Sequence, residues 1–268
     1  MGAEAENVQE NEVEMSFLDH LEALRWHLVR SVIAIGGLAI LAFINKSFIF
    51  DTILLAPKNP DFITYRVMCM ISDRICITEL PFTLMNISMS GQFTNHIFIS
   101  VAAGFIIAFP YVFWEIWRFI KPALYSKETK HTRGVVFFSS LLFLSGVSFG
   151  YFVVAPLAVN FLGSYQVSAE VSNQINLGSY ITTVASIALA CGLVFELPIV
   201  TFFLTRVGLI NPQFMRTYRK HALVLTLVLS AIITPPDVIS QILVAMPLLV
   251  LYEVSIRVSA AVIKRQDR

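Results

Sequence analysis

Carboxylates inside long apolar runs are the residues of this sequence whose chemistry most needs an explanation. Glu196 lies within Cys191-Gly-Leu-Val-Phe-Glu-Leu-Pro198, with apolar or small residues on both sides. Pro198 has no amide hydrogen, so it favours a kink beside this carboxyl group. Ionisable groups in apolar surroundings are costly and are therefore functional candidates. Two interpretations stay open: a protonated Glu196 hydrogen-bonded within its own bundle, or a group in a groove that meets a polar residue of a partner helix.

A second group of charged residues precedes the first apolar run. Residues 16–25 read Ser-Phe-Leu-Asp-His-Leu-Glu-Ala-Leu-Arg, with apolar side chains at helical spacing on one face and Glu22 on another. Ser16 is suited to cap the start of this helix. The pattern predicts an amphipathic helix at a membrane surface. Glu22 and Arg25 can pair on it at i,i+3, which contributes only about 0.2–0.5 kcal/mol.

Glu128 stands in a basic segment between two apolar runs. Lys127, Lys130 and Arg133 surround it. Aromatic residues precede the segment, as is typical of a membrane interface. From these residues alone, the simplest interpretation of Glu128 is an ion-pair partner of its basic neighbours.

The sequence contains none of the motifs that would indicate catalysis or cofactor binding. It has no GxxxxGK[ST], HExxH, GxSxG or CxxC pattern. Its five histidines are scattered, at positions 20, 27, 96, 131 and 221. We therefore expect no enzymatic activity, no catalytic residue, no metal site and no cofactor. The formal charge of +1, without a Lys/Arg-rich run, argues against nucleic-acid binding.

The elements that must position these residues are helices long enough to cross a bilayer. Hydrophobic residues make up 56% of the 268 residues and charged residues 14%, whereas a soluble domain carries about 25% charged residues. A helix needs about 20 apolar residues to span the hydrocarbon core. The sequence predicts an all-α polytopic membrane protein with six transmembrane helices, the last two of them short. They cover 26–44, 96–116, 134–162, 180–205, 221–233 and 238–251.

The Lys and Arg residues predict the orientation of these helices. All but four of the 19 lie in segments on one side of the predicted membrane; the exceptions are Lys46, Lys58, Arg66 and Arg74. Cytoplasmic loops retain Lys and Arg. Both termini are therefore predicted to be cytoplasmic.

The segments outside the helices divide the chain further. Residues 1–15 are acidic and lack an apolar stretch, which predicts a disordered tail rather than a cleavable signal peptide. A six-span membrane domain over 16–258 and a cytoplasmic tail over 259–268 follow. Within the domain, residues 45–93 are predicted to form a folded outer cap. It contains Cys69 and Cys76, and spacing alone leaves a disulfide and two free thiols both open.

Four ordered motifs resemble one known family, the TatC subunit of the twin-arginine protein translocase. The resemblance covers about residues 17–257, and each motif is weak alone, but their order on six predicted spans makes a chance match very improbable. They are His20-Leu-Glu-Ala-Leu-Arg25, Phe119-Ile-Lys-Pro-Ala-Leu-Tyr125 followed by Glu128, Phe195-Glu-Leu-Pro198, and Thr234-Pro-Pro-Asp-Val-Ile-Ser-Gln241.

The resemblance implies a receptor in the bacterial cytoplasmic (inner) membrane. It would bind the signal peptides of folded precursor proteins, which carry two adjacent arginines, and would assemble with TatA- and TatB-type single-span proteins for export driven by the proton-motive force. It implies signal-peptide binding by Glu128 and Glu22, with Arg25 and Phe119 in the same motifs. It also implies partner contacts through three polar residues: Glu196, Asp237 and Gln241.

Two departures from the family pattern affect this site. The usual acidic position on the first helix aligns with Ala23, and its neighbour Glu22 lies about 100° around the helix. Either Glu22 substitutes after a small rotation, or Glu128 carries more of the recognition. Glu115 stands where the family commonly has glutamine and could supply an extra carboxylate near the same surface.

One other class of function fits the residues. A proton-coupled secondary transporter of a small solute would use Glu196 as its proton relay. Such a transporter needs several polar groups at the membrane midplane, and the sequence offers essentially one carboxyl there.

Overall fold

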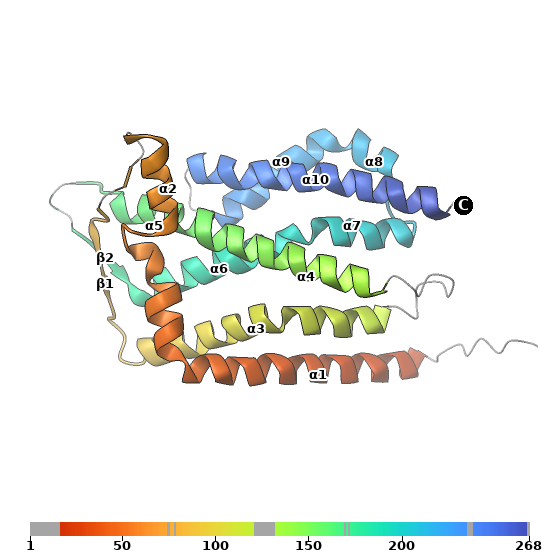
Figure 1. The fold of residues 1–268 in the computed structure, drawn as a ribbon, viewed down its shortest axis with the longest axis horizontal. Coiled ribbons are helices and arrows are strands. Elements are labelled where there is room, and N and C mark those ends of the chain that lie inside the picture. Colours follow the sequence, from red (N-terminus) through yellow and green to blue (C-terminus); the bar gives the residue numbers. More distant parts are fainter. Residues whose placement is uncertain are drawn as a thin grey trace, which may run out of the picture.

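The protein is a bundle of long helices with a small cap at one end (Figure 1). The computed structural model describes residues 17–73, 76–77, 79–120, 132–168, 170, 172–234 and 238–266. The helices of the bundle are α1 (Phe17–Ile44), α3 (Gly91–Ile120), α4 (Thr132–Phe149), α5 (Ala155–Ser164), α6 (Leu177–Phe195), α7 (Leu197–Arg206), α8 (Pro212–Thr217), α9 (Arg219–Ile233) and α10 (Val238–Gln266).

Among the described residues, five helical segments are long and apolar enough to cross a membrane. They cover 22–44, 91–120, 134–164, 177–206 and 240–264. A π-helical turn, η6 (Gly150–Val154), joins α4 to α5 within the third of them. Helix α9 has 15 residues and is shorter than these five. The chain is thus mostly helical, with five described helical segments able to span a membrane.

The prediction of two short final helices is wrong for the last one. Helix α10 does not end near residue 251 but has 29 residues. Its buried face continues beyond residue 251, because Ser255, Ile256 and Ser259 are buried. The charged residues Glu253 and Arg257 lie on the exposed face instead. Charge in the sequence there marks an amphipathic continuation of the helix and not its end.

Glycines bring two pairs of helices into close contact. A Cβ atom added to Gly104 of α3 would lie 2.7 Å from the Ala39 amide nitrogen of α1. One added to Gly146 of α4 would lie 2.6 Å from the Cys191 carbonyl oxygen, and one on Gly150 would lie 2.9 Å from the Ala188 Cα atom. Small residues one turn apart allow helices in a membrane to pack at short distance. The backbones of α1 and α3, and of α4 and α6, therefore touch.

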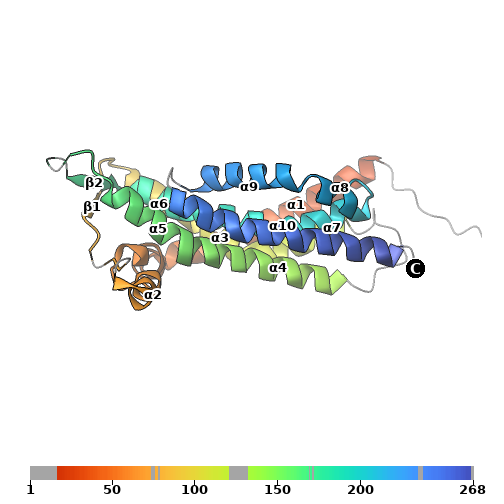
Figure 2. The same ribbon diagram turned by 90° about the horizontal axis from the view of Figure 1, so that it is seen from above.

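The cap is built from short elements of the segment between α1 and α3. They are η1 (Phe48–Leu54), η2 (Ala56–Lys58), α2 (Ile63–Ile71) and strand β1 (Phe82–Met85), which pairs in parallel with β2 (Asn173–Asn176). Figure 2 shows α2 on the side of the bundle where α4 lies, with α9 on the opposite side.

Two features hold the cap together. The Tyr65 side chain is fully buried, and its hydroxyl lies 3.0 Å from the Pro57 carbonyl oxygen and 2.8 Å from that of Pro156. This burial raises the pKa of Tyr65 well above its ordinary value. Cys69 and Cys76 form a disulfide, with their Cα atoms 4.1 Å apart. Of the two states that the spacing left open, the structure contains the bonded one.

Candidate functional site

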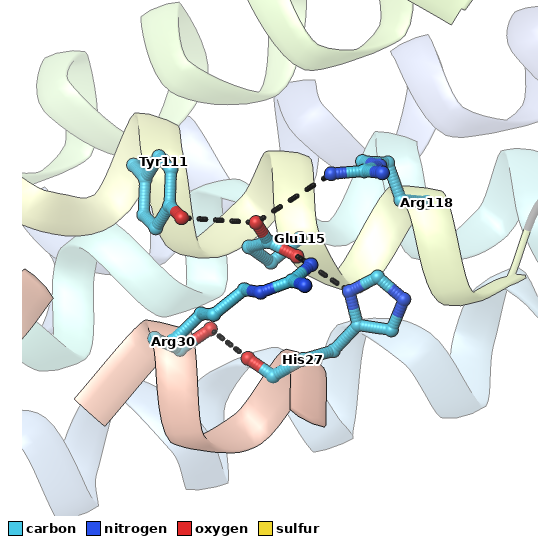
Figure 3. A network of polar contacts seen from close by, with 6 residues as sticks. His27, Arg30, Tyr111, Glu115 and Arg118 are labelled. Carbon is cyan, nitrogen blue, oxygen red and sulfur yellow. Dashed lines mark hydrogen bonds and ion pairs between the residues drawn. The ribbon is translucent and has the colours of Figure 1, made fainter. Parts of the chain in front are cut away.

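The clearest polar cluster of the bundle surrounds Glu115, at the end opposite the cap (Figure 3). The Glu115 side chain of α3 is 1% exposed. Its Oε2 atom lies 2.5 Å from Nδ1 of His27 on α1, and the Tyr111 hydroxyl donates a 3.0 Å hydrogen bond to its Oε1 atom. A buried carboxylate requires such partners, because burying it unpaired is costly. Both oxygens of Glu115 are therefore engaged within the protein.

Two arginines complete this cluster at longer distance. Arg30 of α1 lies 4.0 Å from Oε2 of Glu115, and Arg118 of α3 lies 3.9 Å from Oε1. Their side chains are about half exposed, at 49% and 46%. The Arg118 guanidinium also stacks over the Trp114 ring, 4.9 Å from its centroid. One carboxylate thus faces two permanent cations and an imidazole. We call His27, Arg30, Tyr111, Glu115 and Arg118 the Glu115 cluster.

The cluster brings together two of the predicted signal-peptide residues, Glu115 and Phe119. The His27 ring contacts both of them: its Nδ1 atom lies 2.5 Å from Glu115, and it makes an edge contact with Phe119 at 6.2 Å between ring centroids. Glu22 and Arg25 are exposed on α1 nearer its start, and neither forms an ion pair within the described residues. The i,i+3 pairing of Glu22 with Arg25 is therefore not seen. The expectation for Glu128 falls on the segment 121–131, outside the described residues.

His27 was not predicted to be a site residue, because the five histidines are scattered along the sequence. A signal was present in the spacing. His27 and Arg30 are three residues apart on α1, and Tyr111, Glu115 and Arg118 recur at intervals of four and three on α3. Both sets place polar groups on one helical face close to the ends of apolar runs. Pairing the two sets across helices would have pointed to this cluster.

Glu196 lies at a break between two helices of the bundle. Helix α6 ends at Phe195 and α7 begins at Leu197, with Pro198 in its first turn. The predicted effect of Pro198 on the helix beside Glu196 is thus confirmed. The Glu196 side chain is buried, and its Oε2 atom accepts a 2.8 Å hydrogen bond from the Ser139 hydroxyl of α4. Its Oε1 atom is buried without a hydrogen-bond partner among the described residues.

Of the two polar residues predicted at the hairpin between α9 and α10, one is described. Gln241 donates a 3.1 Å hydrogen bond to the Leu227 carbonyl oxygen of α9, which joins the two helices. Asp237 lies in 235–237, outside the described residues. Across the described part of the chain, no group of three or more His, Cys, Asp or Glu residues is arranged to hold a metal ion.

The sequence and the fold are both similar to those of one group of known proteins. The model of the family described as "Sec-independent protein translocase protein (TatC)" matches residues 19–247. The Sec-independent protein translocase protein TatC of Blattabacterium sp. subsp. Periplaneta americana (strain BPLAN) is 38% identical over 260 residues, which cover 94% of this chain and 98% of the relative. The protein of that name from Aquifex aeolicus (strain VF5) is 37% identical over 245 residues, 90% of this chain and 93% of the relative.

Solved structures give the same assignment. A structure described as "Crystal Structure of Twin Arginine Translocase Receptor- TatC in DDM" has a TM-score of 0.70 and 36% sequence identity, and the match covers 90% of this chain and 99% of that chain. A second crystal structure of the twin arginine translocase receptor TatC has a TM-score of 0.67 at 34% identity, over 91% of this chain and 99% of that one. The chain belongs to the TatC family of Sec-independent protein translocase subunits.

Proposed function

We propose that this chain is the membrane receptor of a twin-arginine export system, which binds the signal peptides of folded precursors and has no chemical step of its own. The observation that carries the proposal is the exposed carboxylate of Glu22 on α1, unpaired within the described residues, at the same end of the bundle as the Glu115 cluster. Two solved structures that are similar to this chain are described as twin arginine translocase receptors.

We further propose that this end of the bundle faces the cytoplasm. Basic residues gather where α1 begins and where α3, α7 and α10 end, and Figure 1 places these helix ends on one side. Cytoplasmic segments retain Lys and Arg. With both termini inside, α9 and α10 form the fifth and sixth spans of the bacterial inner-membrane protein. The 15 residues of α9 cover about 22 Å, less than the usual core of about 30 Å, so we expect thinned membrane beside it.

The recognition chemistry follows from the ligand. An arginine guanidinium binds a carboxylate through two parallel hydrogen bonds, which a lysine ammonium cannot do. We propose Glu128 and Glu22 as the carboxylates that meet the arginine pair, with Arg25 and Phe119 bordering them. Glu115 lies at the same end of the bundle, but its carboxylate is buried and already bonded to His27 and Tyr111, so we do not propose it as a direct contact of the peptide.

The single-span partners would use a different part of the bundle. Oε1 of Glu196 is an acceptor that lacks a partner within the described residues, and a polar donor on a TatA- or TatB-type helix would satisfy it. We assign Gln241 and Asp237, at the hairpin of α9 and α10, to the same assembly surface. A pull-down from detergent-solubilised native membrane, scored for single-span proteins and bound precursor, tests this assignment.

A photo-cross-linking assay tests signal-peptide binding directly. A twin-arginine peptide is expected to label the regions around Glu22 and Glu128. A peptide with Lys-Lys in place of Arg-Arg should label them at least about tenfold less, because each lysine lacks the second of the two parallel charge-assisted hydrogen bonds, which contributes about 1.5–3 kcal/mol. Equal labelling by both peptides would overturn the proposal. A Glu253→Gln chain, which loses an exposed ion pair between α10 and Arg219 of α9, should be labelled by the twin-arginine peptide as strongly as the unchanged chain.

A further inference from the structure

We propose that Glu115 and His27 form a positioning pair, which fixes α1 against α3 and thereby holds Glu22 and Arg25 in the register that signal-peptide binding requires. This inference rests on the proposed function and assigns to Glu115 a role through α1, not through contact with the peptide. It concerns an interaction that the sequence pattern did not reveal, since His27 was not among the expected site residues.

The burial of Glu115 argues against a direct role in binding the peptide. Its side chain is 1% exposed, and its oxygens already have His27 Nδ1 at 2.5 Å and the Tyr111 hydroxyl at 3.0 Å. An incoming guanidinium would have to displace these groups and pass Arg30 and Arg118, whose like charge repels it. Glu22, in contrast, is exposed to the solvent.

The contacts of Glu115 are the polar side-chain links between the described parts of α1 and α3. Ser31 of α1 and Ser100 of α3 bond only to carbonyl oxygens of their own helices, at 2.9 and 2.7 Å. Elsewhere the two helices meet at Gly104 and Ala39, and the His96 ring of α3 stacks on Phe43 of α1 with 3.9 Å between ring centroids. Close packing holds the helices at short distance, and a hydrogen bond adds a directional constraint on how they slide and rotate.

The His27–Glu115 pair lies close to the start of α1, where it can restrict the movement of that end of the helix. His27 lies about 7.5 Å along the helix from Glu22, at 1.5 Å per residue. The close contact at Gly104 lies about 16 Å from Glu115 along α3 by the same rise. Without the pair, the start of α1 would lose the side-chain hydrogen bond that joins it to α3 at this end of the bundle. The cations of the cluster would also face one another without the carboxylate between them.

Spin-label distance measurements on the full chain in nanodiscs test the proposal. Labels at Leu28→Cys and Ile116→Cys report on α1 and α3, since both side chains are exposed. Native Cys69 and Cys76 are bonded, and Cys191 is buried. We expect a narrow distance distribution in the otherwise unchanged chain. We expect a broad one in Glu115→Ala, in His27→Ala and in the double variant, and no change in Glu253→Ala, which breaks the Arg219 pair elsewhere.

Peptide titrations on the same variants separate positioning from contact. Each single variant should weaken twin-arginine peptide binding at least about tenfold, the equivalent of 1.4 kcal/mol. The double variant should be no weaker than either single variant, because the two residues act as one unit. A His27→Ala variant with unchanged binding, additive losses in the double variant, or unchanged distances would overturn the proposal.

Two controls keep the result interpretable. Size-exclusion elution and thermal unfolding of each variant identify any loss of fold, and Glu115→Leu, which keeps a side chain of similar size but accepts no hydrogen bond, replaces Glu115→Ala if the latter does not fold. Failure of the unchanged chain to bind the twin-arginine peptide would refute the proposed function itself. The distance measurements would still decide, without any peptide, whether the pair fixes α1 against α3.

Discussion

The Ser139 hydroxyl of α4 donates a hydrogen bond of 2.8 Å to the Glu196 carboxyl group at the break between α6 and α7. This bond joins two residues that are 57 positions apart in the sequence and lie inside the apolar bundle. It also shows that Glu196 is satisfied on one oxygen by the protein itself, while the other oxygen lacks a partner within the described residues.

Replacing Ser139 by Ala should lower the free energy of unfolding by about 1–3 kcal/mol, because it leaves a buried carboxyl oxygen unsatisfied. Denaturant unfolding in detergent, followed by circular dichroism, measures this loss. Ser140→Ala is the matched control: its hydroxyl bonds only to the Val136 carbonyl oxygen of the same helix, and we expect a change of less than about 0.5 kcal/mol. Equal losses in both variants would contradict the role of the Ser139 bond.

The position of the acidic group on α1 can be tested by moving it. Glu22→Gln should weaken binding of a twin-arginine peptide, since the neutral amide cannot form a charge-assisted pair. Ala23→Glu in the same background should restore binding at least in part, because it places a carboxylate at the family's usual position. Fluorescence titration with twin-arginine and Lys-Lys peptides measures both effects. A Glu22→Gln variant that binds as tightly as the unchanged chain would assign the recognition to Glu128 alone.

The contact of Gly150, the first residue of η6, with α6 should be sensitive to a single methyl group. In Gly150→Ala the new Cβ would meet the Ala188 Cα atom at 2.9 Å, so the helices must move apart. We expect a loss of about 1–3 kcal/mol of unfolding free energy, the usual range for overpacking. Gly36→Ala on α1 is the control, because its added Cβ meets nothing within 4 Å. Thermal unfolding of the two variants side by side gives the comparison.

Reduction of the Cys69–Cys76 disulfide should loosen the cap. The bridge closes a short loop, with a sequence separation of 7, and chain entropy assigns such a loop about 2.5 kcal/mol. Limited proteolysis near α2 should become faster with reductant and should reach the same rate in a Cys69→Ala, Cys76→Ala variant without it. Reductant should not affect that variant further, since Cys191 is not bonded. Equal rates with and without reductant in the unchanged chain would contradict this expectation.

Hydropathy predicted the helices of the bundle because burial in lipid requires long apolar runs whatever the neighbours are. It failed at α10, where the helix continues with one buried and one exposed face, so that Glu253 and Arg257 do not interrupt it. The break at Glu196 was predictable because Pro198 acts locally. The link between His27 and Glu115 was not, because it joins residues 88 apart and depends on how α1 and α3 pack. The disulfide could not be predicted either, because the spacing of Cys69 and Cys76 permits both a bonded pair and two free thiols.

The parallel pairing of β1 with β2 has a mechanical consequence. Strand β1 is followed by α3 after a short turn, and β2 leads directly into α6, so the four backbone pairs from Phe82 with Asn173 to Met85 with Asn176 tie these two helices together at the cap. Two helices that are joined at one end can separate or rotate most at the opposite end. We therefore expect any relative displacement of α3 and α6 to be smallest at the strands and largest at the far end, where Glu115 and His27 meet.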